Sequence, residues 1–222
     1  MPQYFKPSAP ANPKAAKGAS GAGRTNGSNR IRIIGGTWRS RVIDFPDAEG
    51  LRPTANRVRE TLFNWLGQTL HGKRCLDLFS GSGALGFEAA SRGAVQSVML
   101  EVNAAALAAL KTNQQKLAAS ACQVLAMDAL KFIEGSQEKF DIIFVDPPFT
   151  SGLMTTLLAK LPRMLLDEGV IYVEWGAPIA DMLEKLPAQQ WQIAKQGRAG
   201  AVHFALLQIR TAVDSTRSEK KT

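Results

Sequence analysis

Long apolar runs and cysteines are the features that this sequence most clearly lacks. No stretch reaches the roughly eighteen consecutive apolar residues that a membrane-spanning helix needs. The N-terminal segment has scattered lysines but not the apolar core of a secretory signal. We therefore expect a cytoplasmic protein without a membrane anchor. The two cysteines, Cys75 and Cys122, lie in apolar runs and are predicted to be reduced core residues rather than a redox pair.

Histidine is equally scarce, and acidic residues are missing from one end of the chain. His71 and His203 are isolated and lack the spacing of metal ligands, so no metal site is expected. Before Asp44 there is no acid, and a cationic start on a neutral body suggests a polyanionic partner such as a nucleic acid; a solubilising tail is the alternative. The basic residues of this segment, which equal the whole net charge of +8, are Lys6, Lys14, Lys17, Arg24, Arg30, Arg32, Arg39 and Arg41.

Composition divides the chain into four parts. Residues 1–29 are rich in Pro, Ala, Gly, Ser and Asn and cannot bury enough apolar surface to fold, which predicts a disordered basic tail. Residues 30–70 form an extension, and residues 71–210 are long enough for one folded domain with its own core. Residues 211–222 are polar and are expected to be a flexible C-terminal tail.

The extension is predicted to hold a β-hairpin and a helix. Apolar residues at 31–34 and 38–43 flank the turn signal Gly35-Gly36, and Thr54 is a candidate N-cap for an amphipathic helix over 55–66. Guanidinium groups fixed on ordered elements can bind phosphates at defined positions. The predicted nucleic-acid contacts are therefore Arg32, Arg39, Arg41, Arg52, Arg57 and Arg59.

Strands and helices alternate from residue 73 onwards, which predicts an α/β fold with a Rossmann-like, mostly parallel sheet of seven strands. The predicted strands are Cys75–Phe79, Ser97–Glu101, Gln123–Ala126, Asp141–Val145, Val170–Val173, Gln192–Lys195 and Val202–Ile209. Helices are expected near 84–91, 104–118, 129–135, 152–165 and 178–186. The link over 197–200 is too short for a crossover helix, so the last two strands should pair antiparallel.

A glycine loop after the first strand predicts a nucleotide-like cofactor. Gly81, Gly83 and Gly86 fit the G-x-G-x-x-G spacing, and Glu101 ends the next strand, where it can accept hydrogen bonds from ribose hydroxyls. This pattern suits NAD as well as S-adenosylmethionine. Asp77 favours S-adenosylmethionine, because a carboxylate just before the loop can bind the ammonium group of that cofactor. The pyrophosphate of NAD would gain nothing from a carboxylate at this position.

Asp128 follows the third strand and has two possible roles. It can hydrogen-bond the amino group of an adenine, or it can cap the helix that begins at residue 129, and the two roles are compatible. Ligands of open α/β sheets bind beyond the carboxyl ends of the strands. The predicted residues of the S-adenosylmethionine site are Asp77, Phe79, Gly81, Gly83, Glu101, Val102, Asp128 and Ala129.

The sequence Asp146-Pro147-Pro148-Phe149 at the end of the fourth strand is the candidate catalytic site. Two prolines make a stiff corner without amide donors. The Asp146 side chain and a carbonyl of the corner can then accept both hydrogens of an amino group, while Phe149 offers a face for a flipped base. An exocyclic amine is a poor nucleophile until its lone pair is freed from the ring, and paired acceptors address this problem.

These motifs resemble those of the N6-adenine/N2-guanine methyltransferases. The runs Arg32-Ile-Ile-Gly-Gly-x-Trp-Arg and Gly50-Leu-Arg-Pro-Thr-x-x-Arg-Val-Arg-Glu are more closely similar to the bacterial 16S rRNA guanine-N2 methyltransferases that modify guanine 966, over about 30–210. The resemblance implies a seven-stranded methyltransferase sheet, S-adenosylmethionine as cofactor, and catalysis at Asp146 to Phe149. It also implies that the substrate is 16S rRNA in a small ribosomal subunit or its assembly intermediate. We expect the protein itself to be a monomer.

Three other functions fit parts of the pattern. A DNA adenine-N6 methyltransferase would share both motifs but usually carries an added recognition domain, and little chain follows Asp146 here. An NAD-dependent oxidoreductase would leave Asp-Pro-Pro-Phe unexplained. A non-catalytic rRNA-binding assembly factor would not need the acidic residues of the cofactor and catalytic motifs, which are all present here.

Overall fold

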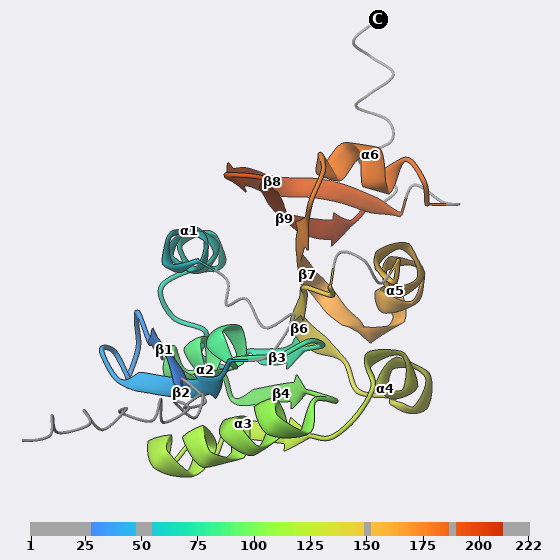
Figure 1. Ribbon diagram of the computed structural model, residues 1–222. Coiled ribbons are helices and arrows are strands. Elements are labelled where there is room, and N and C mark those ends of the chain that lie inside the picture. Colours follow the sequence, from blue (N-terminus) through green and yellow to red (C-terminus); the bar gives the residue numbers. More distant parts are fainter. Residues whose placement is uncertain (1–27, 48–54, 149–151, 187–189, 211–222) are drawn as a thin grey trace, which may run out of the picture.

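The computed structural model describes residues 28–47, 55–148, 152–186 and 190–210 (Figure 1). Their main feature is one seven-stranded sheet with helices on both faces, next to a separate two-stranded hairpin. The order of strands across the sheet is β5 (Cys122–Leu125), β4 (Gln96–Leu100), β3 (Arg74–Asp77), β6 (Phe140–Val145), β7 (Leu165–Trp175), β9 (Val202–Ile209) and β8 (Trp191–Ala199).

The direction of the strands confirms the predicted fold class. Strands β3 to β7 pair parallel with one another, whereas β9 pairs antiparallel with both β7 and β8. The order of the strands reverses at β3, because the chain first adds β4 and β5 on one side and then β6 and β7 on the other. Such a switch point is where open α/β sheets bind their ligands, just beyond the carboxyl ends of the strands.

Two of the predicted helices have different bounds in the structure. The segment expected to be helical over 152–165 forms α5 (Met154–Lys160), a 3-10 turn over Leu161–Met164, and then the start of β7. Pro162 explains the change, because proline has no amide hydrogen and its ring clashes with the carbonyl four residues earlier in an α-helix. The helix expected over 178–186 is the shorter α6 (Ile179–Leu183).

The two faces of the sheet are covered by different helices, as Figure 1 shows. α4 (Ala129–Gly135) and α5 pack on one face over Ile143 and Val145, whereas α1 (Asn56–Leu66) and α2 (Ala84–Ser91) cover the other over Phe144 and Tyr172. α3 (Ala104–Leu117) packs beside β2 and β5. Both cysteines are free and buried in these cores, as predicted. None of the described helices is long and apolar enough to cross a membrane.

The predicted hairpin exists, but its strands lie farther from the glycine turn than expected. They are β1 (Ser28–Arg32) and β2 (Val42–Pro46), so β1 begins inside the segment assigned to the disordered tail. The strand expected over 38–43 begins as a turn at 38–40 and becomes a strand only at Val42. The reason is docking onto α2. The amide of Thr37 donates to the Ser91 carbonyl at 2.7 Å, and a Cβ at Gly36 (φ +73°) would lie 1.8 Å from that oxygen.

A buried cluster of charges fastens this loop and α1 to α2. The Glu88 carboxylate accepts hydrogen bonds from the amides of Ile34 (2.8 Å) and Gly35 (2.7 Å) and from the Arg92 Nε (2.8 Å). Arg59 of α1 lies 3.7 Å from the same carboxylate and donates to the Arg32 carbonyl. α1 itself begins at Asn56, with Ala55 at the N-cap position and no capping side chain, and the expected cap Thr54 lies outside the described residues.

Candidate active site

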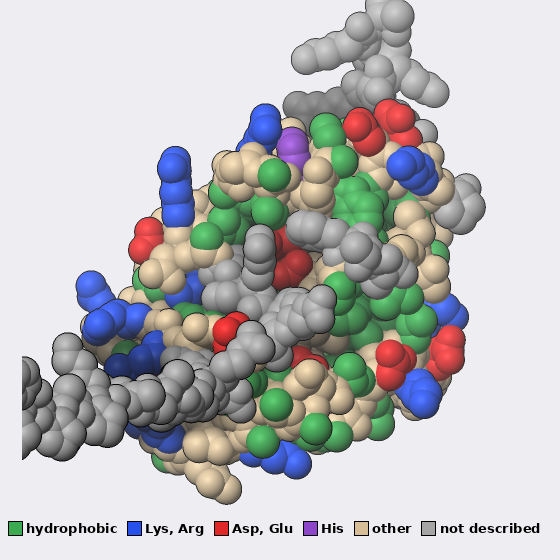
Figure 2. Space-filling model, in the orientation of Figure 1, with side chains coloured by type: hydrophobic (Ala, Val, Ile, Leu, Met, Phe, Trp, Pro, Cys, Tyr) green, Lys and Arg blue, Asp and Glu red, His purple; other side chains and the backbone are tan. Residues whose placement is uncertain are grey.

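Four predicted acidic residues lie along one edge of the sheet. Asp77 ends β3, and Glu101, Asp128 and Asp146 follow the carboxyl ends of β4, β5 and β6. Neighbouring parallel strands are about 4.8 Å apart, so their carboxyl ends bring these side chains into one region. Figure 2 shows acidic side chains at the bottom of a hollow in the middle of the face that it presents.

The glycine loop between β3 and α2 has the backbone geometry that its sequence predicts. Gly81 (φ +47°) and Gly83 (φ +80°) both have positive φ angles, and Gly83 is the N-cap residue of α2. A Cβ on Gly83 would lie 2.6 Å from the side chains of Leu110 and Phe87, so the helix can pack only because this residue has no side chain. The loop therefore exposes backbone rather than side chains to a ligand.

Two backbone amides orient the Glu101 carboxylate. Gly81 donates to Oε2 at 2.8 Å, and Asn103 donates to Oε1 at 2.6 Å. Each oxygen keeps a further lone pair for a ligand. Glu101 is thus held next to the glycine loop with acceptor capacity that could serve a pair of ligand hydroxyls.

Asp77 is a buried carboxyl group without a cationic partner among the described residues. It is 4% exposed, and burial raises its pKa from 3.8 to about 7. The Phe79 amide offers only a long hydrogen bond of 3.4 Å to its Oδ1. A ligand with an ammonium group would supply the missing positive charge, which fits the methionine part of S-adenosylmethionine and not a pyrophosphate.

Beyond the carboxyl ends of β4 and β5, a helix cap lies near exposed apolar side chains. Asp128 accepts a hydrogen bond from the Lys131 amide at 3.1 Å, which confirms its predicted role as the N-cap of α4. Val102 is 72% exposed and Met127 is 41% exposed, although both are large and apolar. A flat apolar ring would cover them, so this part of the edge suits an adenine. The sequence reasoning did not single out Met127.

Asp146 directly follows β6 and is partly buried, next to the buried Pro147 and the exposed Pro148. No described residue donates a hydrogen bond to the Asp146 carboxylate. Burial, followed by the negative charges of Glu174 and Asp77, raises the pKa of Asp146 well above its usual value. A buried acceptor without a donor is ready to receive the hydrogens of a ligand. Phe149, the predicted stacking platform, lies outside the described residues.

Glu174 and Tyr172 belong to the same region, and the sequence reasoning missed both. Glu174, near the carboxyl end of β7, is 6% exposed, and the Tyr172 hydroxyl donates to its Oε1 at 2.8 Å. An acid in the otherwise apolar run Val170–Val173 and Trp175 was the available signal. Burial and the adjacent Glu174 raise the pKa of Tyr172, so the hydroxyl keeps its proton and remains a donor.

Only some of the arginines predicted to contact nucleic acid are exposed. Arg32, Arg39, Arg41 and Arg57 lie at the surface of the extension and α1, and Arg52 lies outside the described residues. Arg59 is a correction, because its side chain is wholly buried against Glu88 and cannot reach a phosphate.

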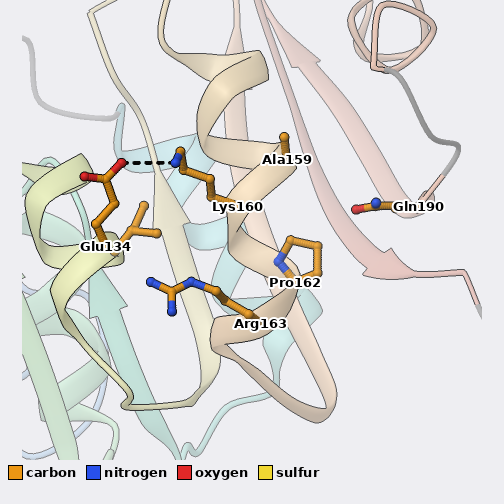
Figure 3. A pocket seen from close by; sticks show the side chains of 7 residues that line it. Glu134, Ala159, Lys160, Pro162, Arg163 and Gln190 are labelled. Carbon is orange, nitrogen blue, oxygen red and sulfur yellow. Dashed lines mark hydrogen bonds and ion pairs between the residues drawn. The ribbon is translucent and has the colours of Figure 1, made fainter.

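A separate open pocket lies at the opposite edge of the sheet (Figure 3). Its lining comes from the C-terminal ends of α4 and α5 and from residues just before β7 and β8, which places it at the amino ends of the strands. Lys160 points to Glu134 there and forms an ion pair of 3.0 Å. The acidic edge described above is therefore a different region of the molecule.

Comparison with known proteins identifies the family. The family model described as conserved hypothetical protein 95 matches residues 31–208. Ribosomal RNA small subunit methyltransferase D of Escherichia coli is 43% identical over 185 residues, which cover 82% of this chain and 92% of that protein. The enzyme of the same name from Haemophilus influenzae is 38% identical over 191 residues, with 82% and 96% covered.

Solved structures agree with this result. A putative methyltransferase from Escherichia coli superposes with a TM-score of 0.73 at 41% identity, over 82% of this chain and 99% of that one. A putative methylase from Haemophilus influenzae gives 0.66 at 34% identity, over 82% and 100%. The chain therefore belongs to the ribosomal RNA small subunit methyltransferase D family.

Proposed function

We propose that this protein transfers a methyl group from S-adenosylmethionine to the exocyclic N2 of a guanine in small-subunit rRNA, and that this guanine is number 966 of 16S rRNA. The observation that carries the proposal is the Asp146 carboxylate, which lies at the carboxyl edge of the sheet and receives no hydrogen bond from any of the described residues. The names of its relatives support rRNA of the small subunit as the substrate.

The cofactor is proposed to lie along the carboxyl ends of β3, β4 and β5. Asp77 would neutralise its ammonium group, Glu101 would accept from its ribose hydroxyls, and Val102 and Met127 would flank its adenine. Asp128 would accept from the adenine amino group with the carboxylate oxygen that the helix cap leaves free. Phe79, Gly81, Gly83 and Ala129 would contact the cofactor through backbone atoms of the loop and of α4. When bound, S-adenosylmethionine supplies a methyl group on a positively charged sulfur.

The protein's own contribution is to prepare the amine. Asp146 and a carbonyl of the proline corner would each accept one hydrogen of the N2 amino group. Accepting both hydrogens pulls the nitrogen towards tetrahedral geometry, which takes its lone pair out of conjugation with the ring and frees it for an in-line attack. The carboxylate stabilises the positive charge that develops on nitrogen. Asp146 is also proposed to take the proton that the amine loses. Phe149 is proposed to stack on the flipped base.

The extension is proposed to bind the RNA. Arg32, Arg39, Arg41 and Arg57 are exposed on β1, on the turn after it and on α1. Figure 2 shows basic side chains gathered on the side of the molecule where β1 and β2 lie. Phosphates held there would keep the substrate in register while one base enters the acidic hollow.

The direct test is to map the modified nucleoside. Unmodified 16S rRNA, free or in small-subunit particles, is incubated with the purified protein and S-adenosylmethionine, and the digest is analysed by mass spectrometry. We expect one N2-methylguanosine per rRNA, at guanine 966. Methylation of an adenine, or of a guanine on another nitrogen, would contradict the proposal.

A further inference from the structure

The register of the sheet brings Glu174 next to Asp146. Phe144 pairs with Tyr172 and Val145 pairs with Val173 in the parallel ladder between β6 and β7. The next residues along the two strands are Asp146 and Glu174. Facing residues of parallel strands project from the same side of the sheet, about 4.8 Å apart. Two carboxyl groups therefore lie side by side where the target amine is proposed to bind.

The surroundings of Glu174 orient its carboxylate. On the same face Tyr172 is fully buried and donates to Oε1 at 2.8 Å. Tyr172 in turn lies between the rings of Phe144 and Phe204, at centroid distances of 6.4 Å to each. A hydrogen bond from a hydroxyl favours the ionised form of a carboxylate. The two carboxyl groups interact directly, because the negative charge of Glu174 contributes to the raised pKa of Asp146.

We propose that Glu174 is the residue that selects guanine, by accepting the N1–H of the base whose N2 amino group is bound at Asp146. This inference rests on the proposed function. In guanine the N1–H lies next to the amino group on the same edge of the ring, so its acceptor must lie beside the acceptor of the amine. Glu174 is the acidic neighbour of Asp146 that meets this condition.

The same carboxylate rejects bases with another pattern of hydrogens. Adenine presents its amino group next to a bare N1, which is an acceptor. An N1 lone pair that faces a carboxylate oxygen cannot form a hydrogen bond with it, and the two acceptors repel each other. A site with one buried carboxylate would serve either base, whereas a second carboxylate in this place favours guanine.

The test uses 2-aminopurine, which keeps the 2-amino group but has no hydrogen on N1. A synthetic oligonucleotide that carries this base at the mapped target position is ligated into 16S rRNA, and kcat/KM is compared with that of the guanine-containing RNA. We expect the wild-type protein to use 2-aminopurine at least a hundredfold less well than guanine. Equal use of the two bases by the wild-type protein would overturn the inference without any variant.

A double-mutant cycle, in which both the side chain and the base are changed, then isolates the contribution of Glu174 to the preference for guanine. Glu174→Gln has the same shape but can present either an oxygen or an amide N–H to N1, so the preference for guanine should fall by at least tenfold. 2-Aminopurine also lacks the 6-oxygen of guanine, but this loss affects the wild-type protein and Glu174→Gln equally. It therefore cancels when the guanine preferences of the two proteins are compared. Tyr172→Phe should weaken the preference less, because it removes one hydrogen bond that orients the carboxylate and leaves the carboxylate itself in place. Glu184→Gln, on exposed surface after α6, is the matched control and should keep the wild-type preference.

The outcomes separate this inference from the proposed function. If wild-type protein methylates no guanine, the proposed function fails. If it methylates guanine and Glu174→Gln, with normal melting temperature and S-adenosylmethionine affinity, keeps the full preference, then Glu174 does not select the base. A Glu174→Gln variant that does not fold leaves the wild-type comparison and Tyr172→Phe as the deciding measurements.

Discussion

At the scale of single residues, Asp77 shows how burial prepares a site for a charged ligand. Its pKa of about 7 means that about half of the ligand-free protein carries a neutral carboxyl group at neutral pH. A bound ammonium group favours the carboxylate, so ligand binding and loss of the Asp77 proton are linked. Glu101, whose carboxylate is already oriented by two amides, needs no such change.

This linkage predicts how cofactor affinity depends on pH. Affinity for S-adenosylmethionine should be highest above pH 7 and should fall as the pH drops below the pKa of Asp77, approaching tenfold per pH unit. The window for calorimetry is about pH 5.5 to 7.5, where the ligand's own α-amino group remains protonated. Asp77→Asn should bind weakly and without this slope. An affinity that is flat across the window would show that Asp77 does not meet the ammonium group.

The same pKa predicts an effect on stability. A carboxyl group with a raised pKa binds its proton more tightly when folded, so its ionisation weakens the ligand-free fold as the pH rises from about 4 to 7. At pH 8, Asp77→Asn should therefore raise the melting temperature, by an effect on the order of a few kcal/mol in unfolding free energy. At pH 5 the gain should shrink, because Asp77 in the folded protein is then already neutral. A loss of stability at pH 8 would contradict this reading of its burial.

At the scale of elements, the cluster around Glu88 joins the extension to the helix that starts at the glycine loop. The Glu88 carboxylate accepts hydrogen bonds from two backbone amides before β2. It also forms ion pairs with Arg59 of α1 and with Arg92 at the C-cap of α2. The Arg59 Nε and Nη1 have no hydrogen-bond partner among the described residues, so the Glu88 charge is the main compensation for that buried cation. The position of the proposed RNA-binding surface thus depends on a contact outside the active site.

Glu88→Gln should loosen that contact. Removing one partner of a buried ion pair typically costs about 3–5 kcal/mol, and the amides of Ile34 and Gly35 should exchange hydrogen faster because their acceptor is weakened. Melting curves and hydrogen exchange measure the two effects. Glu138→Gln is the matched control, because its pair with Arg74 is partly exposed and is expected to be worth at most about 1 kcal/mol. Equal losses in the two variants would mean that the cluster does not fasten the extension.

At the scale of the whole molecule, the sequence predicts the architecture better than the details of the site. Alternating apolar strands and helices, with a short link before β9, are enough for the seven-stranded sheet and its reversed strand. The hairpin boundaries and the burial of Arg59 were missed, because both depend on docking against α2 rather than on local pattern. Glu174 was missed because its neighbour Asp146 comes from another strand, and register is not visible in a linear motif.

The charge distribution predicts which parts of the chain recognise RNA. Replacing Arg39, Arg41 and Arg57 together by Ala should strongly reduce methylation and the salt dependence of RNA binding, while S-adenosylmethionine binding stays intact. Removing residues 1–26, which precede β1 and carry Lys6, Lys14, Lys17 and Arg24, should keep most turnover at saturating RNA. Replacing Lys139, Arg163 and Lys185 by Ala removes equal charge elsewhere and should change little. The recognition surface is misassigned if the tail deletion abolishes methylation and the arginine variant does not.

The account depends most on Asp146 as the acceptor of the target amine. The measurement that tests it most directly is single-turnover methyl transfer to 16S rRNA by Asp146→Ala, with Asp181→Ala on the exposed surface of α6 as control. We predict that the rate of Asp146→Ala falls by about a hundredfold or more, because the lost contact matters mainly in the transition state. Affinity for S-adenosylmethionine and for RNA should stay near wild type. Methylation at a near-normal rate by Asp146→Ala would contradict the account.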